Sequence, residues 1–214
     1  MKKNMEIVCI LDRSGSMSGL ESDTIGGYNA FIERERKECE NSYVTTVLFD
    51  DRYDILVDRK KITEVPKLTE KEYTVRGCTA LVDAVGKTIR HIEKIHQYVR
   101  PEDVPDHTVF MITTDGKENA SHLYSAEEVK RMVKKMTEKF GWEFLFFGAN
   151  IDAIQTAKHY GFREENAVNY HNDGEGIAVL YESAGCAMDE IRNKGSLKNN
   201  RAWREKADRD FKSR

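Results

Sequence analysis

Oxygen-bearing side chains cluster directly after the first long apolar run of the sequence. Five apolar residues, Ile7 to Leu11, are followed at once by Asp12, Ser14 and Ser16. An unbroken apolar run is typical of a strand buried on both faces, and open α/β sheets bind ligands beyond the carboxyl ends of such strands. Because a carboxylate and hydroxyls on one tight loop suit a hard cation such as Mg²⁺, these three residues are candidate metal ligands.

The Asp-x-Ser-x-Ser pattern alone also fits a turn followed by a helix N-cap, since Asp and Ser favour both positions. Two later stretches favour the metal site. Thr79 lies in Gly-Cys-Thr-Ala-Leu, where a glycine-containing loop opens a helix, and Asp115 follows a second buried strand over residues 107–114. Loops that are far apart in sequence can therefore bring five oxygen ligands to one edge of a sheet.

The ordered set Asp12-x-Ser14-x-Ser16, Thr79 and Asp115 resembles a von Willebrand factor type A (VWA) domain with a complete metal-ion-dependent adhesion site (MIDAS). The resemblance covers residues 5 to about 192. It implies that Ser14 and Ser16 coordinate the metal directly, whereas Asp12, Thr79 and Asp115 do so directly or through water. Mg²⁺ is the expected ion, with Mn²⁺ and Ca²⁺ as alternatives. Cys78 departs from the family pattern, in which a Gly or Ser is usual there, without touching the ligand set.

The resemblance also implies how such a site is used. A Mg²⁺ ion held by two carboxylates and three hydroxyls keeps room for an outside ligand, and in this family a partner protein supplies it as Asp or Glu. Small cytoplasmic relatives in bacteria and phages work beside AAA+ ATPases or beside kinase and phosphatase modules. We therefore expect a cytoplasmic bacterial or phage adaptor that binds protein and is not an enzyme.

Two other classes of function stay open as alternatives. A metal-dependent hydrolase is the weaker one, because an aspartyl phosphatase loop needs a second Asp at Ser14, and a serine nucleophile elbow needs Ser at Met17. An RNA-associated VWA protein is the other, because residues 194–214 hold eight Lys or Arg against three acidic residues. We favour packing of that segment on the domain as a short amphipathic helix, since Trp203, Ala207 and Phe211 share one face.

Composition restricts the class of protein. The 214 residues suit one domain over 1–193 with a basic tail over 194–214, and a net charge of −3 with 33% charged residues is typical of a soluble globular chain. Apolar runs are too short to span a membrane. The four cysteines have no paired spacing, which argues against a zinc cluster or a disulfide scaffold. A redox role for Cys78 is considered and disfavoured.

The elements that must position these ligands alternate between strand and helix. This pattern predicts a doubly wound α/β fold, with a mostly parallel six-stranded sheet, one antiparallel edge strand and helices on both faces. We expect strands at 7–11, 43–49, 53–57, 107–114, 142–147 and 167–170, and helices at 20–40, 81–99, 125–139, 152–159 and 174–193.

The connections between these elements carry three further expectations. Residues 58–78 are polar and are predicted to be a connecting segment. Asp50 and Asp51 are explained by the turn of a hairpin, with metal ligation as the weaker alternative. Gly26 and Gly27 weaken the first helix, and we attribute them to a close approach between that helix and the metal loop.

Overall fold

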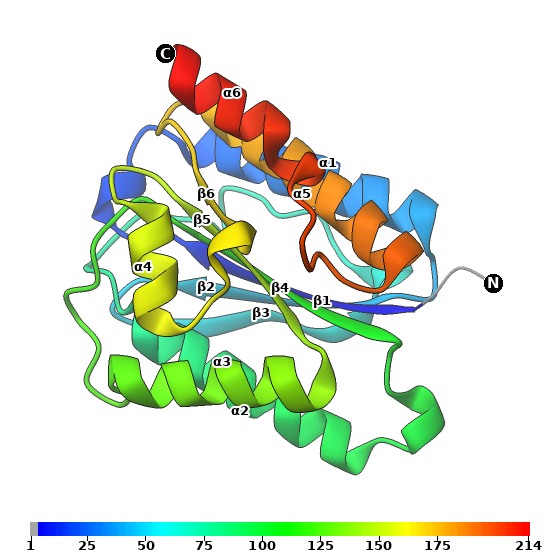
Figure 1. Cartoon of the computed structure of the whole chain (residues 1–214). Coiled ribbons are helices and arrows are strands. Elements are labelled where there is room, and N and C mark those ends of the chain that lie inside the picture. The colour runs from blue at the N-terminus through cyan, green and yellow to red at the C-terminus, as the bar shows by residue number, and fades with distance from the viewer. Residues whose placement is uncertain (1–3) are drawn as a thin grey trace.

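A six-stranded sheet in the order β3-β2-β1-β4-β5-β6 forms the centre of the molecule. The computed structural model describes residues 4–214 (Figure 1). The strands are β1 (Met5–Asp12), β2 (Tyr43–Phe49), β3 (Tyr53–Lys61), β4 (His107–Thr114), β5 (Glu143–Gly148) and β6 (Ala167–Asn169). Every neighbouring pair is parallel except β2 with β3, which is antiparallel at one edge. The predicted fold class is confirmed.

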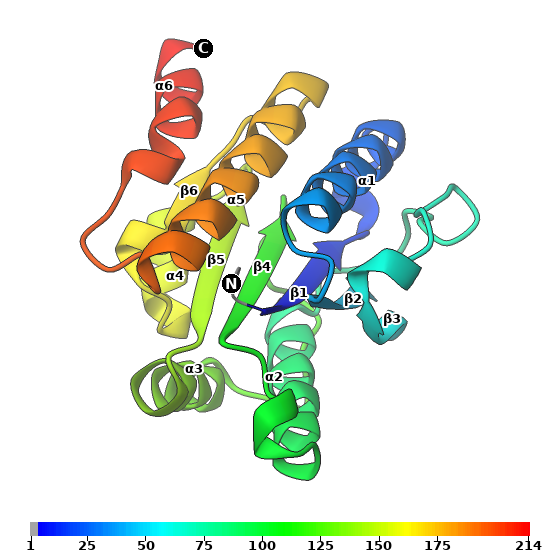
Figure 2. The same ribbon diagram turned by 90° about the vertical axis from the view of Figure 1, so that its right-hand side faces the viewer.

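Helices cover both faces of this sheet (Figure 1 and Figure 2). They are α1 (Glu21–Glu38), α2 (Leu81–Tyr98), α3 (Ala126–Phe140), α4 (Ala153–Tyr160), α5 (Gly174–Lys194) and α6 (Glu205–Ser213). Alternation along β1 divides the core: Ile7 and Cys9 pack in the layer with α1 and α5, whereas Val8 and Ile10 pack in the layer with α2 and α3. A strand apolar on both faces is thereby buried on both faces.

The strand order places a switch point beside β1. The chain leaves β1 through α1 towards β2, and leaves β4 through α3 towards β5, on the opposite side. Connections that diverge in this way open a crevice between the two strands at their carboxyl ends, where ligands of open α/β sheets bind. The sequence places Asp12 and Asp115 at the ends of these two strands.

Strand β3 is longer than the sequence suggests. It runs to Lys61, which pairs with Tyr43, so the first residues of the predicted connecting segment 58–78 belong to the sheet. The register shifts within the hairpin, Arg59 has a positive φ of 43°, and its guanidinium lies 4.3 Å from the centre of the Tyr43 ring. Such a bulge breaks the alternation that sequence patterns depend on, and an edge strand tolerates charged side chains.

The glycines of α1 have another cause than the one predicted. A Cβ on Gly27 would lie 2.3 Å from the Tyr181 ring of α5, whereas a Cβ on Gly26 would meet nothing within 4 Å. Close packing between α1 and α5, and not the metal loop, therefore requires the small residue at position 27. The expectation of an approach to the metal loop was wrong.

The basic segment after α5 packs on the domain. Leu197, Trp203 and Ala207 are buried in the layer formed with α1 and α5, and Phe211 stacks on His171 with ring centres 4.9 Å apart. Of the three residues that share this face, those at positions 203 and 207 are buried and the one at 211 is exposed. This agrees with the predicted amphipathic helix. Within residues 4–214, no helix is both long enough and apolar enough to cross a membrane.

Candidate metal centre

Asp12, the last residue of β1, is held from several sides by neutral donors. The main-chain N–H of Ser14 donates to its Oδ1 at 2.7 Å, and the Thr114 hydroxyl donates to its Oδ2 at 2.6 Å. The Tyr73 hydroxyl donates to the main-chain oxygen of Asp12 at 2.5 Å. The carboxylate is 1% exposed, so its position is fixed inside the protein and is not set by solvent.

A second chain of contacts joins the loop after β1 to the loop after β4. The hydroxyls of Ser14 and Ser16 lie 3.2 Å apart, and the Ser16 hydroxyl donates to Asp115 Oδ1 at 2.5 Å. The Asn172 amide donates to Asp115 Oδ2 at 3.1 Å. Residues that are 99 positions apart in sequence, Ser16 and Asp115, are therefore in direct contact.

Thr79 reaches the same place from the segment before α2. A Cβ on Gly116 would lie 3.1 Å from the Thr79 hydroxyl oxygen and 3.3 Å from the Ser16 hydroxyl oxygen. Asn119 joins the loop after β4 to Thr79 twice: its Oδ1 accepts from the Thr79 N–H at 2.9 Å, and its N–H donates to the Thr79 carbonyl at 3.0 Å. The structure thus brings all five predicted residues to one edge of the sheet, while their role as ligands stays a prediction.

Burial makes this site electrostatically unusual. It raises the pKa of Asp12 to about 6, although the hydrogen bonds from Thr114 and Ser14 act to lower it. Burial also raises the pKa of Asp115. Among the described residues no Lys, Arg or His nitrogen forms an ion pair with either carboxylate. Without a cation, the protein itself disfavours the charged form of both groups.

The other buried carboxylates are compensated. Asp83 accepts from the main-chain N–H groups of residues 122, 123 and 124. The remaining ones pair with basic side chains: Glu6 with Arg59, Glu35 with Arg192, Asp50 with Arg13, Glu93 with Lys135 and Glu143 with Arg163. Asp12 and Asp115 differ from every other buried acid in the described part of the chain, because they have neither a basic partner nor a set of three main-chain N–H donors; Asp12 accepts from one such donor, Ser14.

The donor set fits a hard cation. Two carboxylates and three hydroxyls offer oxygen only, which suits Mg²⁺, Mn²⁺ or Ca²⁺ better than a soft metal. Over residues 4–214 no three His, Cys, Asp or Glu side chains form a group that could hold a metal ion. A cation at this edge therefore depends on the hydroxyls of Ser14, Ser16 and Thr79 as well as on the carboxylates.

Several residues that support the site were missed by sequence reasoning. Thr114 gives a weak signal, a polar residue at the end of an apolar strand. Asn119 and Asn172 give none, because their contacts depend on how two loops fold. Asp50 accepts from the Arg52 N–H at 2.6 Å, as the turn predicts, but its other oxygen binds Arg13 and Arg76, which argues against metal ligation.

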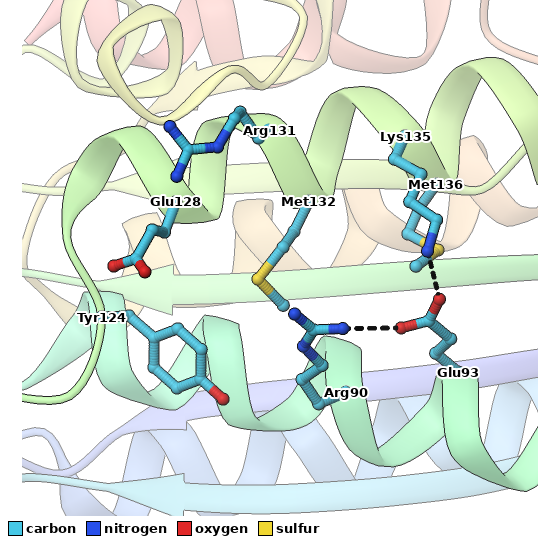
Figure 3. Close-up of a pocket in the computed structure, with 8 residues that line it drawn as sticks. All are labelled: Arg90, Glu93, Tyr124, Glu128, Arg131, Met132, Lys135 and Met136. Atoms are coloured by element: carbon cyan, nitrogen blue, oxygen red, sulfur yellow. Dashed lines mark hydrogen bonds and ion pairs between the residues drawn. The ribbon is translucent and has the colours of Figure 1, made fainter.

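Away from the metal centre, a hollow lies between α2 and α3 and has a volume of about 250 Å³ (Figure 3). Glu93 pairs there with Lys135 at 2.6 Å and with Arg90 at 3.4 Å. The buried side chains of Met132 and Met136 contribute its apolar lining. Its lining holds three basic residues against two acidic ones, so it lacks the uncompensated carboxylates that distinguish the site at β1 and β4.

Comparisons with known proteins agree on the fold. No protein-family model and no curated protein sequence matches the chain. Among solved structures, the PilB minor pilin from Streptococcus sanguinis superposes with a TM-score of 0.64 at 10% identity, over 90% of this chain and 63% of the pilin. The SpRpn10 VWA domain gives a TM-score of 0.57 at 10% identity, over 84% of this chain and 94% of that domain.

A third similar structure is the manganese-loaded TRAP protein of Plasmodium vivax, with a TM-score of 0.55 at 17% identity, over 83% of this chain and 72% of TRAP. The chain spans less than two thirds of the pilin's length. At these identities the likeness shows a fold of the VWA type and says nothing about activity.

Proposed function

We propose that this chain is a metal-dependent protein interaction domain, whose metal-bound site binds a carboxylate of a partner protein. The observation that carries the proposal is the pair of buried acids, Asp12 and Asp115, which have no basic partner in the described part of the chain. A divalent cation would supply the missing charge. The VWA fold and the manganese-loaded TRAP structure of the same fold support this proposal.

The residues that would hold the ion are Asp12, Ser14, Ser16, Thr79 and Asp115, with Mg²⁺ as the expected metal and Mn²⁺ or Ca²⁺ as alternatives. When bound, the ion supplies positive charge and a coordination position open to an outside oxygen ligand. The protein keeps the ligands in place: Thr114 and the Ser14 N–H hold Asp12, while Ser16 and Asn172 hold Asp115. Ligands ordered in advance lose little conformational freedom when the ion binds.

The expected partner presents an Asp or Glu side chain. A carboxylate gains a direct bond to a partly desolvated cation, whereas a neutral side chain gains much less. We propose an adaptor role in the cytoplasm of a bacterium or in phage infection, beside an AAA+ ATPase or a kinase or phosphatase module. This part of the proposal rests on the family resemblance of the sequence.

Binding, and not catalysis, is the activity that we propose. The Ser14 and Ser16 hydroxyls contact each other and the Ser16 hydroxyl donates to Asp115, and no histidine base is among the hydrogen-bond partners found for them in residues 4–214. RNA binding through the basic segment is disfavoured, because four of its eight basic side chains form ion pairs with acidic residues of the chain. Lys194 pairs with Glu190 at 2.7 Å, Arg204 with Asp208 at 2.7 Å and Arg214 with Asp173 at 2.8 Å.

Calorimetric titration of EDTA-treated protein with Mn²⁺ and Mg²⁺ tests the site. We expect saturable binding to the wild type and, for Asp12→Asn, an affinity lower by at least about tenfold, because one of two charged ligands is lost. Glu127→Gln, an exposed position on α3, is the control and should bind as the wild type does. Equal affinity of the wild type and Asp12→Asn would contradict the proposal.

Capture of a partner tests the binding step. A partner isolated in Mg²⁺ should be released by EDTA and recovered when Mg²⁺ or Mn²⁺ is restored. Thr79→Ala in this chain and a change of one acidic partner residue to its amide should each weaken capture. Binding that is equally strong in EDTA would rule out the metal-dependent mechanism.

A further inference from the structure

A buried ion-pair network lies next to the candidate metal centre, at the turn between β2 and β3. Its central group is the Asp50 carboxylate, which is fully buried. Asp50 Oδ2 accepts from Arg13 Nε at 3.0 Å and from Arg76 Nε at 2.7 Å. Both arginines also contact Asp54, whose side chain is 54% exposed. One carboxylate oxygen thus holds two guanidinium groups together.

The two arginines belong to the two loops that carry metal ligands. Arg13 lies between Asp12 and Ser14, and Arg76 lies three residues before Thr79. The Arg76 N–H donates to the Arg13 carbonyl at 2.9 Å, so the loops also touch through their main chains. Without the acid between them, two positive side chains would repel each other at this contact.

The main chain of the same turn reinforces this connection. The Arg13 N–H donates to the Phe49 carbonyl at 2.9 Å, and the Ala80 N–H donates to the Asp50 carbonyl at 2.8 Å. Gly77 has a φ of 70°, and a Cβ there would lie 2.1 Å from Asp51 Oδ1. The segment before Thr79 is therefore packed tightly against the hairpin turn and has little freedom to move away.

We propose that Asp50 is a positioning residue of the metal centre, which locks the loop of Asp12 and Ser14 to the loop of Thr79 through Arg13 and Arg76. This inference rests on the proposed function. Turn formation needs only the Oδ1 atom, which accepts from the Arg52 N–H. The Oδ2 atom is directed at the two arginines, and the turn alone gives no reason for that arrangement.

The charge of Asp50 gives this network of Arg13, Asp50 and Arg76, which we call the clamp, a second role. The Arg13 side chain is 5% exposed and directly follows a metal ligand in sequence, so its positive charge is poorly screened from a cation at the site. Asp50 neutralises it. Although burial acts to raise the pKa of Asp50, hydrogen bonds from Arg76 and Arg52 and the charge of Arg13 lower it, which keeps the counter-charge present at neutral pH. Asp12 and Asp115 then retain their full attraction for a divalent ion.

Mn²⁺ titration of Asp50→Asn tests this inference. We expect an affinity about 10- to 100-fold lower than in the wild type, the range typical of residues that orient metal ligands. Asp54→Asn is the matched control, because the Asp54 side chain contacts the same arginines from an exposed position. This variant should change the Mn²⁺ affinity by less than about threefold. Asp50→Glu, which keeps the charge, should recover part of the lost affinity.

A double variant separates the clamp from a general loss of structure. Arg13→Gln with Asp50→Asn leaves no unpaired buried charge, so it should fold even where Asp50→Asn does not. Its Mn²⁺ affinity should exceed that of Asp50→Asn, because the repelling charge is gone, and stay below the wild type, because the clamp is gone. A merely structural role for Asp50 would not produce this order of affinities.

The outcomes distinguish the two proposals. If the wild type binds Mn²⁺ no better than Asp12→Asn, the proposed function fails and the role of Asp50 fails with it. If the wild type binds Mn²⁺ more tightly than Asp12→Asn, but Asp50→Asn or the double variant binds as the wild type does, only the role of Asp50 is overturned.

Discussion

The two ends of β1 each bury a carboxylate, and they treat it differently. Glu6, near the start of the strand, is fully buried and receives Arg59 Nε at 2.9 Å, with His96 Nε2 at 3.5 Å. Asp12, at the other end, is 1% exposed and is bound by hydroxyl and main-chain donors. A buried acid with its own arginine has a counter-charge, whereas one with only neutral donors still lacks a positive charge. The contrast separates a structural carboxylate from one available to an external cation.

Glu6→Gln should give the largest effect on folding. It leaves the Arg59 guanidinium, 15% exposed, without its counter-charge, and breaking a buried pair in this way costs about 3–5 kcal/mol of unfolding free energy. Urea denaturation in EDTA measures it. Asp12→Asn under the same conditions should leave the unfolding free energy unchanged or raise it. Equal losses for the two variants would remove the distinction between the two ends of β1.

The second-largest expected effect is the pH dependence of the unfolding free energy of the metal-free protein. The pKa of Asp12 is raised from 3.8 to about 6, so the folded state holds this proton more tightly than the unfolded chain does. The contribution of Asp12 to the unfolding free energy should therefore fall as pH rises from about 4 to about 6, by about 3 kcal/mol for a shift of roughly two pKa units. The burial of Asp115 acts in the same direction.

Asp12→Asn provides the control for this pH dependence, because the amide does not titrate. The difference between the wild-type and variant curves isolates the contribution of Asp12, and it should be flat above about pH 7. A difference curve that is flat between pH 4 and pH 6 would show that Asp12 is not disfavoured as a carboxylate.

Metal binding should restore the unfolding free energy that is lost when Asp12 is deprotonated. Mn²⁺ at 100 times its dissociation constant should raise the unfolding free energy by about 2.7 kcal/mol, because it binds the folded state alone. Thermal unfolding at pH 7.5, with and without Mn²⁺, measures this gain. Glu6→Gln should keep the full gain despite its lower stability, and Asp12→Asn should lose it. If Glu6→Gln lost this Mn²⁺-dependent gain, the carboxylates at the two ends of β1 would be energetically coupled.

Thr114→Val should give the smallest effect. It removes the hydroxyl that donates to Asp12 Oδ2 at 2.6 Å, and the loss of one hydrogen bond of this kind costs about 1 kcal/mol. Because that bond lowers the pKa of Asp12, the variant should titrate at a higher pH than the wild type. NMR titration of the Asp12 carboxyl carbon measures the shift, and an unchanged or lower pKa would contradict the described geometry.

The sequence was sufficient to predict the buried strands β1 and β4 and the loops that follow them, but not the full length of β3. The apolar runs of β1 and β4 identify buried strands, and the carboxyl ends of neighbouring parallel strands lie at one edge. The convergence of Asp12 and Asp115 follows from that geometry, whereas Thr79, which lies before α2, was included because of its glycine-containing loop and the resemblance to a VWA domain. It needs no knowledge of side-chain contacts, which is why pattern and spacing predicted it.

Pairings between charged side chains could not be predicted in the same way. Whether Glu6 pairs with Arg59, or Asp50 with Arg13 and Arg76, depends on register, on the bulge at Arg59 and on the path of residues 62–78. None of these leaves a periodic signal. The sequence therefore identified the acids that could bind metal, and the structure was needed to show which buried acids already had a partner.

The hydrogen bond between Thr114 and Asp12 joins residues 102 positions apart. Its formation must wait until β4 has docked beside β1, since closing so long a loop carries a large entropic penalty in the early stages of folding. We therefore expect the polar edge to assemble late in folding. If these contacts form after the transition state, an ion bound there should lengthen the lifetime of the native protein while leaving the rate of refolding nearly unchanged.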